Sequence, residues 1–280
     1  MTPREKKLRF DEIGYWSEIK LEIVKDYASE YSKILVAQKS KVSLEHVYID
    51  AFAGAGVHLS KYDKSKFIAG SPLNALAIDP PFKRFYLIDL DSKKVEHLKS
   101  LVADRSDVEI LHGDCNEVLK KYVFPNVRYD RFQRGLCLLD PYGLHLDWEV
   151  IEEAGKMLSL EIFLNFPIAD MNRNVLWHDR KDVDPEDIAR MNSFWGDDSW
   201  QKSAYRQDLF GYDLKEGNTA IAKAFQERLK KIAGFKYVSE PLPMRNSQRA
   251  IVYYLFFASH KPVATKIVDH IFNKYLERGL

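Results

Sequence analysis

Residues 48–56 read Tyr-Ile-Asp-Ala-Phe-Ala-Gly-Ala-Gly, an apolar strand that ends in an acid and runs into a loop containing Gly54 and Gly56. Glycines at such a turn let the backbone approach a ligand closely. Asp50 stands where it can orient this loop or bind a cationic amine of the ligand, and Phe52 lies between the acid and the glycines. A tight glycine turn with a solvated acid is the structural alternative. With the signals that follow, the stretch predicts a strand leading into a ligand-binding loop.

Strand-length apolar runs and helical patterns alternate after this stretch. The predicted strands are 47–49, 84–88, 108–111, 136–139 and 162–166, and the helical patterns between them are 72–78, 92–102, 116–121 and 147–157. Such alternation is typical of a parallel sheet covered by helices on both faces. The runs are apolar throughout, as expected for strands buried on both sides.

Both ends of the chain depart from this alternation. Strands are predicted at 237–239 and 251–258, joined by a loop with two prolines and no room for a helix, which favours an antiparallel pair at the sheet edge. A last helix is predicted at about 263–277. At the other end, apolar residues recur at helical spacing over 15–38 and predict a long helix within an N-terminal helical extension, residues 1–45.

Acids also follow the next two strands. Asp89 ends the run 84–88, about one strand–helix–strand unit after the glycines, where a carboxylate can accept both hydroxyls of a ribose. A solvent-facing turn acid is the alternative there. Asp114 follows the run 108–111, with Cys115 beside it, and can accept a hydrogen bond from an adenine amine. A helix N-cap explains Asp114 equally well.

Residues 140–143 read Asp-Pro-Tyr-Gly at the end of the fourth strand. Pro141 fixes its own φ and restrains Asp140, so the carboxylate and the next carbonyl are held in place. Tyr142 adds an aromatic face. This turn suits gripping an amine and stacking a flat ring, which makes these three residues the candidate catalytic group. An ordinary Asp-Pro turn is the alternative.

Two more residues are candidates for contacting a substrate. Asn165 ends the fifth strand on the same sheet edge, although a polar strand terminus before Pro167 explains it equally well. Trp177 lies in the segment 167–217, near the basic cluster 173–181. Because this segment leaves the sheet where ligands bind in open α/β folds, it is predicted to be a helical insertion that acts as a lid or recognition element.

Composition limits the remaining classes of function. The 280 residues carry 42 basic and 41 acidic side chains, so no global attraction to nucleic acid is expected. The two cysteines predict reduced thiols in a cytoplasmic protein, and the eight histidines show no metal-binding spacing, so no metal is expected. No apolar run is long enough for a membrane span. The whole chain is predicted to form one domain.

The four acidic motifs resemble, in order and spacing, those of class I S-adenosylmethionine (SAM) methyltransferases. The resemblance implies a seven-stranded, mostly parallel sheet with a C-terminal antiparallel hairpin, SAM as cofactor, and cofactor contacts from Asp50, Phe52, Gly54, Gly56, Asp89, Asp114 and Cys115. A Rossmann dehydrogenase is disfavoured because the full Gly-x-Gly-x-x-Gly pattern is absent.

A closer resemblance, over nearly the whole chain, is to the three-Cys-motif partner protein family (TcmP). It rests on the helix containing Lys20 and on the stretches YIDAFAGAG, AGSPLNAL, FYLIDLD, LLDPYG, LNFP and FWG. The family name implies a companion protein with three clustered cysteines. YIDAFAGAG also resembles ribosomal-RNA adenine-amine methyltransferases, and Asp140-Pro141-Tyr142-Gly143 resembles the corresponding turn of tRNA guanine-amine dimethyltransferases. Both likenesses imply methylation of an exocyclic base amine.

Three hypotheses follow from these motifs. The first is a SAM-dependent N-methyltransferase acting on a nucleic-acid base. The second is a partner subunit of a three-Cys-motif protein that binds SAM without independent catalysis. The third is a nucleic-acid binder without chemistry, in which the basic clusters 61–66 and 173–181 contact phosphates; solvated surface faces are the alternative for these clusters.

Overall fold

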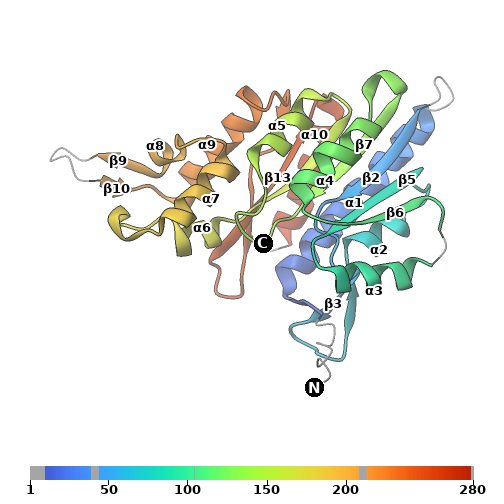
Figure 1. The fold of residues 1–280 in the computed structure, drawn as a ribbon, viewed down its shortest axis with the longest axis horizontal. Helices are drawn as coiled ribbons and strands as arrows, with labels where there is room; N and C mark the ends of the chain where they lie inside the picture. The colour runs from blue at the N-terminus through green and yellow to red at the C-terminus, as the bar shows by residue number, and fades with distance from the viewer. Residues whose placement is uncertain (1–9, 39–43, 104, 208–212, 279–280) are drawn as a thin grey trace.

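The computed structural model describes residues 10–38, 44–103, 105–207 and 213–278. A mixed sheet of eight strands forms its centre: β2 (Glu45–Asp50), β5 (Arg84–Asp89), β6 (Val108–His112), β7 (Gln133–Leu139), β8 (Leu160–Phe166), β11 (Tyr237–Val238), β12 (Leu242–Arg245) and β13 (Ile251–Ser259). The order across the sheet is β11-β13-β8-β7-β2-β5-β6, with β12 also beside β13 (Figure 1). The five strands from β8 to β6 are parallel, and β13 runs antiparallel to β8.

Helices cover both faces of this sheet. One face carries α1 (Tyr15–Gln38), α2 (Ser71–Leu76), α3 (Ser92–Val102) and α10 (Pro262–Glu277). The other carries α4 (Cys115–Val118), α5 (Trp148–Lys156), α6 (Ile168–Asn174), α7 (Pro185–Trp195), α8 (Trp200–Ala204) and α9 (Asn218–Lys231). Because side chains alternate along a strand, Tyr48 of β2 packs in the first layer and Ile49 in the second. The expectation of a sheet buried on both sides is confirmed.

The predicted elements agree closely with those observed. The long N-terminal helix spans the predicted residues, and α3 begins after Asp91, whose carboxylate accepts a hydrogen bond from the Lys93 amide. The pattern predicted at 116–121 is α4 followed by one π-helical turn, Leu119–Val123. Short 3-10 turns follow at Phe124–Asn126, Tyr129–Arg131 and Arg180–Asp182.

The predicted count of seven strands is wrong, because the edge strand is broken in two. Tyr237 of β11 lies opposite Ser259 and Leu242 of β12 lies opposite Leu255, so the edge carries one extra residue between these pairs. The predicted loop between the last two strands therefore contains β12. Its proline, Pro243, is tolerated because β12 is an edge strand, where one side of the backbone needs no partner.

Several small elements were not predicted. A three-stranded sheet joins β1 (Glu12–Ile13), β3 (Val57–Ser60) and β4 (Phe67–Ala69), and it extends from the glycine loop. The segment predicted as a helical insertion contains α6, α7 and α8, but also an antiparallel pair, β9 (Tyr205–Gln207) and β10 (Asp213–Lys215). Helix α9 was missed, although its apolar residues pack against β13.

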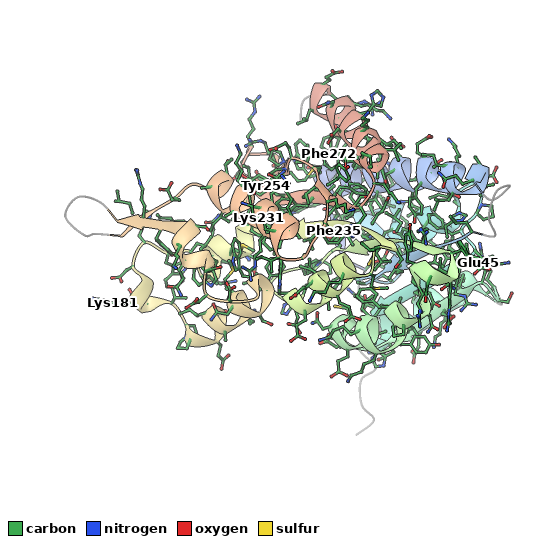
Figure 2. The ribbon with its side chains drawn as sticks, turned by 90° about the horizontal axis from the view of Figure 1, so that it is seen from above. Glu45, Lys181, Lys231, Phe235, Tyr254 and Phe272 are labelled. Carbon is green, nitrogen blue, oxygen red and sulfur yellow. The ribbon has the colours of Figure 1, made fainter. Side chains whose placement is uncertain are left out.

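The segment after β8 lies at one end of the molecule. Lys181 in this segment and Glu45 at the start of β2 lie at opposite ends of the long axis (Figure 2). Within the described ranges, no helix combines the length and the apolar character that a bilayer crossing requires.

Candidate functional site

The predicted acids meet at one edge of the sheet. Asp50 and Asp89 are the last residues of β2 and β5, Asp114 follows β6, and Asp140 follows β7. Asn165 lies one residue before the end of β8. Because these strands are neighbours and parallel, their carboxyl ends bring the five side chains to the same edge, where open α/β sheets bind ligands.

Asp50 is fully buried beneath the glycine loop. Its Oδ1 accepts a hydrogen bond from the Phe52 amide at 3.2 Å. Burial raises the pKa of Asp50 to about 7, partly offset by the Ser71 side chain and the Phe52 amide. With no exposed surface and with the Phe52 amide as a donor, this carboxyl is placed to orient the loop.

We expect Asp50 to make the stability of the protein depend on pH. Its folded pKa lies above its unfolded value, so its contribution is present in acid and is lost as the pH rises from about 4 through about 7. Between about pH 5 and about pH 7 the wild type should lose about 2 kcal/mol of unfolding free energy relative to Asp50→Asn, measured by urea unfolding. Parallel pH profiles of the two proteins would contradict this.

Asp89 fixes the glycine loop from the neighbouring strand. Its Oδ2 accepts the Gly54 amide at 2.8 Å, and its Oδ1 accepts the Asp91 amide at 2.8 Å. Both oxygens keep further acceptor capacity, because a carboxylate offers about four lone-pair sites. The residue expected to bind a ribose therefore also sets the loop beside it.

Both glycines of the loop adopt the left-handed region, with φ of +64° at Gly54 and +80° at Gly56. A Cβ on Gly54 would meet nothing within 4 Å, whereas one on Gly56 would lie 2.8 Å from Cδ1 of buried Leu98. Gly54→Ala should therefore cost about 1 kcal/mol from backbone strain alone, and Gly56→Ala about 2 kcal/mol. Urea unfolding of both variants measures the difference, and equal losses would show that Leu98 gives way freely.

A cavity of about 430 Å³, here called the Asp114 cavity, opens at the ends of β2 and β6. Asp114 caps α4 by accepting the Asn116 amide at 2.8 Å, so the N-cap interpretation is confirmed and leaves its second oxygen for a ligand. Burial raises the pKa of the Cys115 thiol to about 12, which makes it an apolar wall rather than a nucleophile. Leu90 also lines the cavity and is 69% exposed.

A second cavity of about 260 Å³, here called the Lys20 cavity, lies beside Asp140. Lys20 reaches it from α1 and donates to both oxygens of Asp140, at 2.6 Å to Oδ1. Burial alone would lower the pKa of Lys20, but the charge and hydrogen bond of Asp140, together with Tyr253 and Asp50, outweigh it and the pKa is raised. Lys20 is therefore a buried ammonium that holds the carboxyl group of the predicted catalytic turn in place.

The turn after β7 is fixed by Asn165. The Asn165 Nδ2 donates to the Pro141 carbonyl at 3.0 Å, so that carbonyl is already engaged. The Asn165 Oδ1 is buried in the lining of the Lys20 cavity and lacks a hydrogen-bond partner among the described residues. An unpaired buried acceptor costs free energy, and a ligand N–H would remove that cost. Tyr142 lines the same cavity, is 70% exposed, and donates to Asp11 at 3.0 Å.

Phe52 lines both cavities, so the two cavities adjoin at this residue. The segment predicted to cover the site also contributes to both, with Asp170 and Arg173 in the Lys20 cavity and Arg190 in the Asp114 cavity. The Lys20 cavity and the Asp114 cavity therefore adjoin at the carboxyl ends of the strands and share Phe52.

Several predicted residues do not line either cavity, namely Asp50, Gly54, Gly56, Asp89 and Trp177, and some lining residues were missed. Trp177 is 40% exposed and donates through Nε1 to the Arg173 carbonyl, outside both cavities. Sequence reasoning named Lys20 only as part of a helix, although its place on the apolar stripe with Val24 and Tyr27 is a signal of burial. Leu90 carried no such signal.

Comparison with known proteins concerns the fold alone. No family model and no curated protein matches the chain. Protein LPL1258 from Legionella pneumophila, of the DUF519 family model, covers 92% of this chain and 93% of its own at 13% identity and a TM-score of 0.50. Candidate methyltransferases from Thermobifida fusca (12% identity, 88% of this chain and 80% of that chain, TM-score 0.43) and Listeria monocytogenes (14%, 86% and 100%, TM-score 0.41) align less well. The chain is thus an α/β protein with a mixed multistranded sheet, similar in fold to LPL1258.

Proposed function

We propose that this chain is a SAM-dependent methyltransferase that methylates an exocyclic amine of a nucleic-acid base. One observation carries the proposal: acids end consecutive parallel strands at one sheet edge, and two of them, Asp114 and Asp140, line adjoining cavities there. The strand order, with five parallel strands and an antiparallel β13, agrees with the topology that the class I resemblance implies.

The Asp114 cavity and the glycine loop fit the cofactor. The space beside Gly54 is open, because a Cβ built there would meet nothing within 4 Å. Asp89 offers lone pairs to ribose hydroxyls. Asp114 would accept the adenine amine, with Leu90 and Cys115 against the ring. Bound SAM would supply the activated methyl group.

The Lys20 cavity suits the amine that receives the methyl group. The Asp140 carboxylate and the Asn165 Oδ1 would accept the amine hydrogens, which orients the nitrogen lone pair. Lys20 holds the Asp140 side chain in place, so the site is organised before the substrate arrives. The exposed ring of Tyr142 would stack on the base. The segment 167–217, which contributes Asp170 and Arg173, would close over it.

Transfer of labelled methyl groups tests this function. Purified protein is incubated with tritiated SAM and with RNA and DNA made without modifications, and the products are digested to nucleosides. Label in an adenosine or guanosine methylated on its exocyclic amine is expected, and S-adenosylhomocysteine should suppress it. Label on a ring carbon, or none on any nucleic acid, would contradict the proposal.

One observation favours a second function, a SAM-binding subunit that needs a companion. Both Asp140 oxygens already contact Lys20, so a rearrangement driven by a partner would free the acid. Co-expression with a three-Cys-motif protein should then give a stable complex, with methyl transfer only in the complex. A chain that stays monomeric in the companion's presence would argue against this function.

A further inference from the structure

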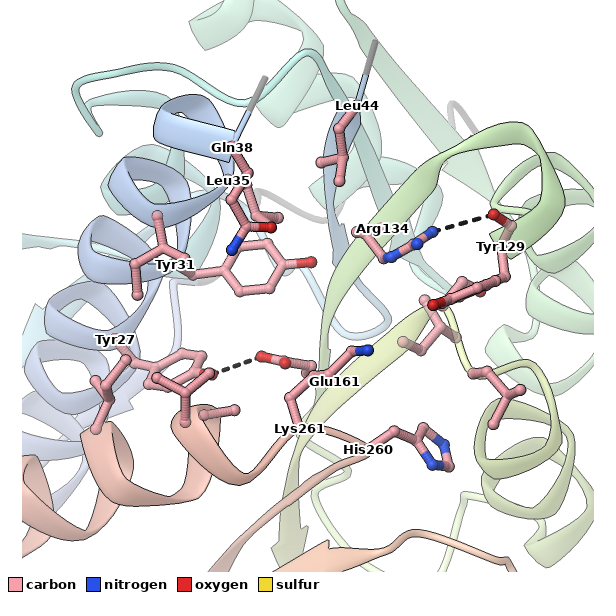
Figure 3. A pocket seen from close by; sticks show the side chains of 17 residues that line it. Tyr27, Tyr31, Leu35, Gln38, Leu44, Tyr129, Arg134, Glu161, His260 and Lys261 are labelled. Atoms are coloured by element: carbon pink, nitrogen blue, oxygen red, sulfur yellow. Dashed lines mark hydrogen bonds between the residues drawn. The ribbon is translucent and has the colours of Figure 1, made fainter. Parts of the chain in front are cut away.

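A third cavity lies where the parallel strands β7 and β8 begin, at the opposite end of the strands from the candidate site. It encloses about 340 Å³ between α1, α10 and the first residues of β7 and β8 (Figure 3). We call it the Glu161 cavity. Its walls are largely apolar, and they include Leu35, Leu44 and Ile267. Its size falls within the range of small-molecule sites, about 300–1,000 Å³.

The acid in this cavity is already satisfied. Glu161 accepts hydrogen bonds from Tyr27 at 2.5 Å and from Ser259 at 2.9 Å. Tyr31 is not satisfied: its hydroxyl is buried, 6% of the residue is exposed, and no hydrogen-bond partner is found in the described part of the chain. In Figure 3 this hydroxyl points across the cavity toward Arg134. Since an unpaired buried hydroxyl is costly, Tyr31 indicates a ligand atom in the space between them.

Two cations share this space. Arg134 lies over the Tyr129 ring, 3.6 Å from its centroid, and donates to the carbonyls of Tyr129 and Gln133. The Lys261 Nζ also lies near this ring, 5.9 Å from its centroid. Neither has a carboxylate within 4 Å among the residues that the structure describes. Arg134 is half-buried and Lys261 exposed, so the positive charge stands where the cavity opens.

We propose that the Glu161 cavity binds a small amphipathic carboxylate. Arg134 and Lys261 would hold the carboxylate, and the Tyr31 hydroxyl would donate to it. The apolar body of the ligand would lie against Leu35, Leu44 and Ile267. This proposal does not rest on the proposed methyl transfer, because the site uses none of the same side chains and lies at the other end of the strands.

Calorimetric titration with 4-phenylbutyrate and with its neutral amide tests the site. The two probes share an apolar body and differ in charge. Saturable binding of the acid, at least about tenfold tighter than that of the amide, is expected. Excess S-adenosylhomocysteine should leave the affinity unchanged. No saturable binding, equal binding of acid and amide, or competition by S-adenosylhomocysteine would overturn the proposal.

Three variants and a matched control locate the binding. Arg134→Gln and Lys261→Gln should each remove most of the preference for the acid, and Tyr31→Phe should weaken acid binding about fivefold. Lys266→Gln removes an exposed cation from the same helix outside the cavity and should change nothing. Since Lys261 is exposed, its variant should fold even if Arg134→Gln does not. Unchanged acid preference in Lys261→Gln and Tyr31→Phe would also overturn the proposal.

Discussion

Asp140→Ala is expected to lower methyl transfer about 1,000-fold and to lower the unfolding free energy by about 3 kcal/mol. Transfer falls because the carboxylate proposed to accept hydrogen bonds from the substrate amine is gone. Stability falls because Lys20, with a side chain only 9% exposed, is left charged without its partner. Single-turnover transfer and urea unfolding measure the two losses, and titration with SAM should show nearly unchanged binding.

The double variant Lys20→Met, Asp140→Ala separates these two effects. Replacing a buried ion pair with apolar groups of similar volume is often neutral, so most of the lost stability should return. Methyl transfer should stay absent, because the Asp140 carboxylate has not been restored. Recovery of transfer together with stability would mean that Asp140 acts only through the fold, and unchanged turnover in Asp140→Ala alone would sink its assignment.

Asp89→Ala is expected to weaken SAM binding at least about 100-fold. Charge-assisted hydrogen bonds to two ribose hydroxyls should together contribute about 3 kcal/mol or more. The Gly54 amide also loses the acceptor that fixes the loop, which adds to the effect. Isothermal titration with SAM and S-adenosylhomocysteine measures the change.

Asp91→Ala is the matched control for this variant. Asp91 is an acid two residues away that caps α3 through the Lys93 amide, whereas Asp89 accepts the Gly54 amide of the glycine loop. Its removal should cost about 1 kcal/mol of stability and leave the cofactor affinity unchanged. Equal affinities for wild type and Asp89→Ala would reject the ribose assignment, whereas no SAM binding by the wild type would contradict both proposed functions.

The sequence was most informative where local signals and burial agree. Apolar runs predicted the parallel strands, because β2, β5 and β7 are buried on both faces and admit few polar residues. Helix α3, which has a capping residue, was predicted to the residue. The same strand ends located Asp140 and Asn165 on one cavity.

Long-range contacts could not be predicted in this way. The pairing of Lys20 with Asp140 joins residues 120 positions apart, and no local pattern encodes it. The prolines around β12 resembled a loop, because the tolerance of an edge strand depends on what lies beside it. Trp177 was taken as a substrate contact from its neighbours in sequence, but its indole donates to the Arg173 carbonyl at the end of α6.

Helix α1 connects the two ends of the sheet. It is a single helix of 24 residues that supplies Lys20 to one cavity and Tyr31 to another, about 16 Å apart along its axis. The two sites would be thermodynamically linked if a ligand at one of them bound one position of this rigid rod more tightly than another. A molecule beside Tyr31 that favours one position of the rod would change affinity beside Lys20, and a substrate there would change affinity beside Tyr31 by the same factor.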